Sequence, residues 1–117
     1  MRLYSLLQSF VNYANGQYHL EPLLRQEEKT VNFRFGDESC SLQISRDYIE
    51  LVHEERGTEQ IICLDEKDIE QLVNGNVRLQ MLMNDGRVQY SGTYRTMLLV
   101  ESMFHICKPM SVGCLKF

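Results

Sequence analysis

The chain has 117 residues, of which 44% are hydrophobic and 24% charged, so it can bury one hydrophobic core. The formal net charge is -4 and the Lys and Arg residues are scattered, which argues against nucleic acid or an anionic membrane surface as the main partner. No window holds the 18 or more apolar residues of a spanning helix. We therefore expect a single domain over residues 1–117, cytoplasmic, without stable membrane insertion.

The N-terminal segment has the apolar spacing of an amphipathic helix. Its apolar residues recur at intervals of three and four and form one stripe, made of Leu3, Leu6, Leu7, Phe10, Val11 and Ala14. Asn15 and Gly16 provide a stop, because both tolerate a positive φ. Further on, Pro22 fits the first turn of a short helix and not a helix interior.

Four segments with alternating apolar and polar side chains follow, with turns between them. They cover residues 30–35, 40–45, 48–55 and 58–64, and their short spacing predicts an antiparallel meander. The aliphatic residues fall on one face, and the other face carries Asn32, Arg34, Gln43, Ser45 and Glu50. This pattern is typical of a sheet that helices cover on one side.

The second half of the chain contains one well-marked helix and one ambiguous stretch. Asp65 is a plausible N-cap, acidic residues fill the first turn, and Asn74-Gly75 ends the helix. Residues 77–83 satisfy both a strand alternation and a helical face, so their pattern alone does not decide between the two. Residues 87–92 predict a strand with Val88 and Tyr90 on one side.

The last helix is expected from Tyr94 to Ile106, after the N-cap residue Thr93. It is apolar almost all the way round, which requires burial on most sides or an apolar ligand. Glu101 and His105 are four residues apart and share a face. We interpret them as a polar edge of the helix with a modest ion pair, with a contact to a ligand head group as the alternative. The tail over residues 111–117 adds an edge strand or stays irregular.

Two blocks of this half resemble the C-terminal half of the sterol carrier protein 2-like (SCP2-like) family. They are DEKDIEQLVNGNVRLQMLM, residues 65–83, and GRVQYSGTYRTMLLVESMF, residues 86–104. The resemblance rests on the order of parts: an Asp-rich helix start, a Leu-Val-x-Gly stop, a short apolar run, a glycine-bounded strand and a long apolar helix. It spans roughly residues 60–107, and the segment from Tyr18 to Lys29 has no clear counterpart.

The resemblance implies an α+β fold with a mostly antiparallel five-stranded sheet covered on one face by helices. It also implies a helix over residues 78–83 and an apolar tunnel between sheet and helices for a fatty-acyl chain or similar lipid. On this basis the expected ligand-binding residues are Phe33, Phe35, Leu42, Ile44, Leu82, Met83, Val88, Tyr90, Met97, Leu98, Met103 and Phe104.

The remaining chemistry of the sequence favours binding over catalysis. Five of the six methionines come late, at positions 81, 83, 97, 103 and 110, and flexible thioethers suit either a cavity wall or an ordinary core. Cys63 and Cys107 fit buried free thiols, and the cysteines and histidines show no metal-ligand spacing. No nucleotide-binding or acyl-hydrolase motif is present. We expect no enzyme activity, no metal and no cofactor.

Two functions remain open at this point. The first is non-catalytic binding or carriage of an apolar small molecule or lipid. The second is a cavity-less interaction protein of the same fold, whose late apolar helix forms a homodimer or docks a partner.

Overall fold

The computed structural model describes residues 2–15, 28–45 and 48–106 of the chain. Within these residues one sheet has the strand order β3-β2-β1-β4-β5. The pairing of β1 with β4 is parallel and the other three pairings are antiparallel, which confirms the predicted α+β fold with a mostly antiparallel five-stranded sheet. The strands are β1 (Lys29–Phe35), β2 (Glu38–Ile44), β3 (Ile49–Val52), β4 (Glu59–Cys63) and β5 (Val88–Ser91).

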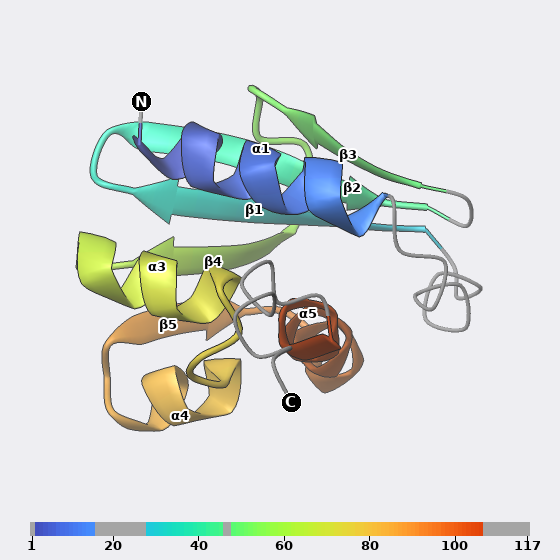
Figure 1. Ribbon diagram of the computed structural model, residues 1–117. Helices are drawn as coiled ribbons and strands as arrows, with labels where there is room; N and C mark the ends of the chain where they lie inside the picture. The colour runs from blue at the N-terminus through green and yellow to red at the C-terminus, as the bar shows by residue number, and fades with distance from the viewer. Residues whose placement is uncertain (1, 16–27, 46–47, 107–117) are drawn as a thin grey trace, which may run out of the picture.

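The described helices lie on one side of this sheet. They are α1 (Arg2–Ala14), α3 (Glu66–Val73), α4 (Leu79–Asn84) and α5 (Tyr94–Ile106). Figure 1 shows α1 in front of β1 and β2, with α3 and α5 below it. The side chains that the sheet turns toward the helices are apolar and buried, and we call this surface the inner face. Its buried members are Val31, Phe33, Cys40, Leu42, Ile44, Ile49, Leu51, Ile61, Cys63 and Val88.

Helix α1 is the predicted amphipathic helix, and polar contacts hold both of its ends. The predicted stripe is buried except for the half-buried Leu6. At the N-terminus, the Glu38 carboxylate accepts a hydrogen bond of 2.8 Å from the backbone N–H of Leu3. At the C-terminus, the Asn15 amide exchanges hydrogen bonds of 2.9 and 2.8 Å with the backbone of Ile49. These contacts fix the position of α1 over β2 and β3.

The two short helices also follow the sequence. The Asp65 carboxylate caps α3 by accepting a hydrogen bond of 3.1 Å from the backbone N–H of Lys67. Residues 79–84 form α4, so the helix expected over residues 78–83 is confirmed. Gly86, with φ of +73°, turns the chain from α4 into β5, a conformation that favours glycine.

The position of β4 corrects one prediction. The four early strands were expected to form a continuous antiparallel meander, but only β1, β2 and β3 do so. Strand β4 lies beside β1 and runs parallel to it, with Phe33 opposite Ile61. Residues 53–58 therefore carry the chain from one edge of the sheet past β2 and β1. The alternation of side chains defines the two faces of a strand and leaves its neighbour undetermined.

A buried amide holds this crossing segment against the open face, the side of the sheet opposite the helices. Asn32 is 4% exposed, and its side-chain N–H donates to the Gly57 carbonyl at 2.7 Å. Its side-chain oxygen accepts from the backbone N–H groups of Gly57 and Arg56 at 3.0 and 3.1 Å. The Ser41 hydroxyl oxygen also accepts from the Arg56 N–H, at 2.9 Å. A side chain at Gly57 would collide with the Thr30 carbonyl oxygen, so this close approach requires glycine.

Three expectations lie outside the described residues. They are the short helix start at Pro22, the role of the tail over residues 111–117, and the buried thiol of Cys107. Met110, one of the late methionines, also lies there.

Candidate functional site

The sheet side of the predicted ligand site is formed by neighbouring strands in register. Phe33 of β1 lies opposite Cys40 of β2 and opposite Ile61 of β4, and all three side chains are buried. Leu42 and Ile44 continue the same surface along β2 and are also buried. The alternation seen in the sequence thus places these predicted residues on one apolar surface.

The far end of the inner face joins β1, β4 and β5. Phe35 and Val88 both pair with Cys63, one from each side, while Tyr90 pairs with Ile61. Val88 is buried, and Phe35 and Tyr90 are half-buried against the core. The predicted residues of this end are therefore close to one another, although they come from two separate parts of the sequence.

Helix α4 contributes two further predicted residues. Leu82 is buried, and Met83 is partly buried and packs against the core. Met81, on the other side of the same helix, is 56% exposed, so it does not belong to the interior. The late methionines are thus divided between the core and the surface.

Helix α5 supplies the opposite wall. Met97, Met103 and Phe104 are buried, in agreement with their predicted inward position. Leu98 is 36% exposed and lies on the outer side of α5, apart from the other predicted residues. Viewed down the helix axis, with 100° between successive residues, the buried side chains of α5 occupy an arc of roughly 200°. Leu99 lies at one edge of this arc and Glu101 at the other.

Three aromatic rings from separate elements meet at the centre of this interior. The Phe104 ring lies 4.7 Å from the Phe10 ring and 6.2 Å from the Phe33 ring, measured between centroids, both in edge-to-face arrangements. Such pairs contribute about 0.5–1.5 kcal/mol each beyond the burial of their area. Phe10 was not among the predicted site residues. Its place in the apolar stripe of the first helix was the signal that marked it as inward-facing.

A polar cluster fixes the start of α5 on the sheet. The Glu59 carboxylate accepts hydrogen bonds of 3.0 Å from both the backbone N–H and the hydroxyl of Thr93. The Thr93 hydroxyl oxygen in turn caps α5 by accepting from the backbone N–H of Thr96 at 3.2 Å, which confirms the predicted cap. The Tyr90 hydroxyl donates to the Thr93 carbonyl at 2.7 Å. Strands β4 and β5 therefore both determine where α5 begins.

The same contacts shift the acidity of two groups. Partial burial favours the neutral acid, but the hydrogen bonds from Thr93 and Thr96 and the charge of Lys29 outweigh it. The pKa of Glu59 therefore lies below its ordinary value of 4.5. Burial, reinforced by the Glu59 carboxylate, raises the pKa of Tyr90 to about 12. At neutral pH the cluster thus holds a carboxylate and a neutral phenol.

Glu101 corrects another prediction. It was interpreted, together with His105, as a polar edge of the helix with a modest ion pair, but Glu101 is only 4% exposed and lies in the interior. Its carboxylate accepts hydrogen bonds of 3.1 Å from both the backbone N–H and the side-chain amide of Gln80. Gln80 lies in the first turn of α4, where N–H groups have no partner within the helix. Glu101 therefore caps α4 from another helix, a role that depends on tertiary structure.

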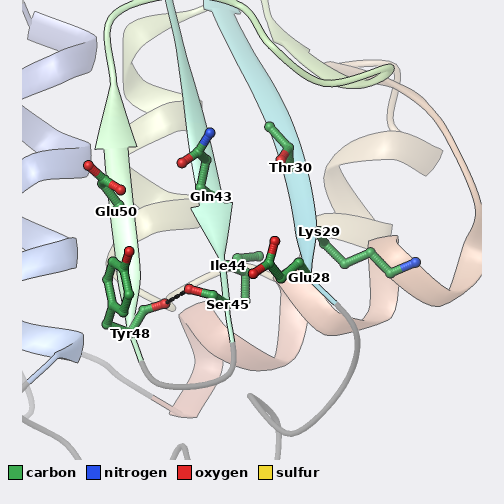
Figure 2. Close-up of a pocket in the computed structure, with 8 residues that line it drawn as sticks. All are labelled: Glu28, Lys29, Thr30, Gln43, Ile44, Ser45, Tyr48 and Glu50. Atoms are coloured by element: carbon green, nitrogen blue, oxygen red, sulfur yellow. Dashed lines mark hydrogen bonds between the residues drawn. The ribbon is translucent and has the colours of Figure 1, made fainter.

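The open face carries a different kind of hollow, of about 200 Å³. Figure 2 shows Thr30, Gln43 and Glu50 in a row on three neighbouring strands, with Tyr48 and Ser45 at the strand ends. The Ser45 hydroxyl donates to the Tyr48 carbonyl at 2.9 Å. The hollow is smaller than typical small-ligand pockets of about 300–1,000 Å³, and its lining is mostly polar. It does not suit the apolar ligand that the sequence predicts.

The interior offers a ligand apolar side chains and two buried thiols. Cys40 and Cys63 are buried free thiols, as expected for Cys63. Burial, with a smaller contribution from Glu38, raises the pKa of Cys40 to about 11. Burial, with a smaller contribution from Asp68, raises the pKa of Cys63 to about 12, so both thiols are protonated and unreactive at neutral pH. Among the described residues, no three His, Cys, Asp or Glu side chains gather to hold a metal ion.

Within the described ranges, no helix is both long enough and apolar enough to cross a membrane.

Comparisons with known proteins show which solved structures share this fold. No protein-family model and no curated protein sequence matches the chain. Solved structures do match. The crystal structure of sterol carrier protein 2 has a TM-score of 0.65 at 10% identity, over 91% of this chain and 92% of that chain. The UbiJ-SCP2 ubiquinone synthesis protein has a TM-score of 0.64 at 16% identity, over 89% of this chain and 86% of that chain. Palmitated SCP2L2 from Aedes aegypti has a TM-score of 0.59 at 8% identity, over 90% of this chain and 96% of that chain. The chain thus has the SCP2-like fold that its sequence resembled.

Proposed function

We propose that this protein binds a fatty-acyl chain or a similar lipid between the inner face of the sheet and α5. The observation that carries the proposal is the wide buried arc of α5. A helix that packs on one surface needs an apolar stripe of about 100°, and α5 buries roughly twice that arc. In the structure α1 covers part of this arc through Phe10 and α4 covers its edge at Glu101. Under the proposal, the ligand inserts between α5 and the elements that pack on it.

Ligand entry requires the aromatic centre to open, and the magnitudes permit it. Separating Phe104 from Phe10 and Phe33 forfeits two aromatic pairs, about 1–3 kcal/mol in total. Burying each methylene group of an acyl chain contributes about 0.8 kcal/mol. Four buried methylenes therefore offset the lost ring contacts. Each further methylene contributes toward the roughly 4–15 kcal/mol that association costs in lost translational and rotational freedom. The flexible thioethers of Met97 and Met103 can rearrange around chains of different shape.

The comparisons support this proposal. The solved neighbours include sterol carrier proteins, and one neighbour is described as palmitated. The formal net charge of -4 suits an uncharged apolar partner better than nucleic acid. The proposed role is carriage or binding without catalysis, in the cytoplasm and without membrane insertion.

The first test is native mass spectrometry of the protein as purified. The expected result is a monomer that carries an apolar adduct of small-molecule mass, released by mild denaturation and identified after extraction. A protein that carries no adduct, and that also fails to bind added methyl laurate, would refute the proposal. Methyl laurate is chosen because its head carries no charge.

A pair of methionine variants locates the site. Met103 is fully buried in the interior, whereas Met81 is exposed on the outer side of α4. We expect Met103→Ala to weaken methyl laurate binding at least tenfold and Met81→Ala to leave it unchanged. If Met103→Ala only lowers the free energy of unfolding by the 2–5 kcal/mol typical of core truncation, and binding stays the same, the proposed position of the ligand is wrong.

The outer side of α5 favours a second candidate function. Tyr94, Leu98 and Ile106 are exposed large apolar residues on this one helix. Such a surface suits homodimerisation or docking of a partner. Sedimentation over a range of concentrations tests it: a dimer that Leu98→Glu dissociates would support this function, and a monomer at every concentration would exclude the homodimer.

A further inference from the structure

A second hollow lies outside the interior, where α3, α4 and the start of β5 come together. It has a volume of about 360 Å³, within the range of about 300–1,000 Å³ typical of small-molecule sites. Figure 1 shows α3 and α4 one above the other at the end of the sheet where β5 begins. We call this hollow the α3–α4 groove. Its lining residues are Lys67, Asp68, Gln71, Val77, Met81, Leu82, Asp85 and Arg87.

A buried carboxylate holds an arginine in the groove. Asp68 is only 5% exposed, and its carboxylate lies 3.2 Å from a terminal guanidinium nitrogen of Arg87. The Arg87 backbone N–H also donates to the Leu82 carbonyl at 2.9 Å. The sequence marked Asp68 only as one of the acidic residues in the first turn of its helix, and its contact with Arg87 comes from the tertiary structure. The guanidinium itself remains largely exposed, so its other N–H donors are accessible from the groove.

The rest of the groove combines apolar contacts with two opposed surface charges. Val77, Leu82 and the exposed Met81 supply apolar lining. Lys67 adds a second cation, and Asp85 opposes it with a negative charge. Because the charges of Lys67 and Asp85 oppose each other, selectivity for an anion depends mainly on the guanidinium N–H donors of Arg87, which Asp68 holds in place.

We propose that the α3–α4 groove binds a small amphiphile with an anionic head, a phosphate or carboxylate group joined to a short apolar chain. Arg87, oriented by Asp68, contacts the head, and Val77, Met81 and Leu82 contact the chain. Leu82 belongs both to this groove and to the predicted interior residues, whereas Arg87, Val77 and Met81 lie outside that predicted set. The proposal does not depend on the interior site.

Octyl phosphate is the probe, and the methionine methyl groups report where it binds. In protein labelled with ¹³C at the methionine methyls, octyl phosphate is expected to shift the Met81 signal in a saturable way. Octyl glucoside, with a neutral head, and inorganic phosphate, without a chain, are expected to bind at least tenfold more weakly. No Met81 shift up to the micellar limit of octyl phosphate would overturn the proposal. A shift of Met103 with Met81 unmoved would also overturn it, while supporting the interior site.

Charge variants test which side chain contacts the head. Arg87→Gln is expected to weaken octyl phosphate binding at least tenfold, whereas Arg34→Gln, on the opposite face of the sheet, is expected to leave it unchanged. Lys67→Gln is expected to weaken binding about threefold and Asp85→Asn to tighten it about threefold, because the two exposed charges act on the same anion. If Arg87→Gln fails to fold, Lys67→Gln and Asp85→Asn test whether the anionic head binds in the groove. Wild-type affinity in folded Arg87→Gln, or in both Lys67→Gln and Asp85→Asn, would overturn the proposal.

Discussion

Replacing Asn32 with alanine should destabilise the fold more than any other single change on the open face. The variant leaves the backbone N–H and carbonyl of Gly57 without their partner, while the Arg56 N–H retains the Ser41 hydroxyl. Leaving a buried polar group unpaired costs about 1–3 kcal/mol. For two such groups, with some access to water, we expect Asn32→Ala to lower the free energy of unfolding by about 2–4 kcal/mol.

Urea unfolding followed by far-ultraviolet circular dichroism measures this loss. Gln43→Ala is the matched control, because it also truncates an amide on the open face and lies outside the Asn32 network; its expected effect is below about 0.5 kcal/mol. Ser41→Ala should lie between the two, near 1 kcal/mol, since the Arg56 N–H keeps its contact with Asn32. If Asn32→Ala costs no more than Gln43→Ala, residues 53–58 are not held by this amide.

Three further predictions concern a glycine, a carboxylate and two thiols. Gly57→Ala should cost about 1–3 kcal/mol in urea unfolding, because its new methyl group collides with backbone of β1; unchanged stability would contradict this. The folded-state pKa of Glu59 lies below its unfolded value of 4.5, so its stabilising contribution is present above pH 4.5 and is lost as the pH falls through the folded pKa. Glu59→Gln should therefore be less stable at pH 7 and lose less stability on acidification, whereas parallel pH profiles would refute the assignment. A rise in the Cys40 pKa from 9.0 to about 11 lowers its thiolate fraction at pH 8 by about 100-fold. Mass spectrometry after iodoacetamide treatment should accordingly find Cys40 and Cys63 unmodified in folded protein and modified in urea.

Much of the fold was predictable because its signals are local. Helix α3 begins where Asp65 caps it and α5 where Thr93 does, and each cap acts within three residues of itself. The alternation along β1 and β2 placed Phe33 and Leu42 on the inner face, since successive side chains of a strand point to opposite sides. The predicted ligand-binding residues on the strands face the interior for this reason, and those on the helices do so through helical periodicity, with one exception. The exception is Leu98, which lies on the outer side of α5, while the polar residues Thr96 and Glu101 occupy positions in the buried arc.

The sequence by itself determined which side chains of the strands face inward, where α1, α3 and α5 begin and end, and the SCP2-like order of the parts. That one domain spans residues 1–117, and that the late helix contacts a lipid, stay predictions. Only the tertiary structure decided the parallel placement of β4 beside β1, the capping of α4 by Glu101 and the anchoring of Arg87 by Asp68. In each case the partners are distant along the chain: 21 residues separate Glu101 from Gln80, and 19 separate Arg87 from Asp68. Periodicity and capping act over a few residues, so such pairs are chosen by how the packed elements meet in space.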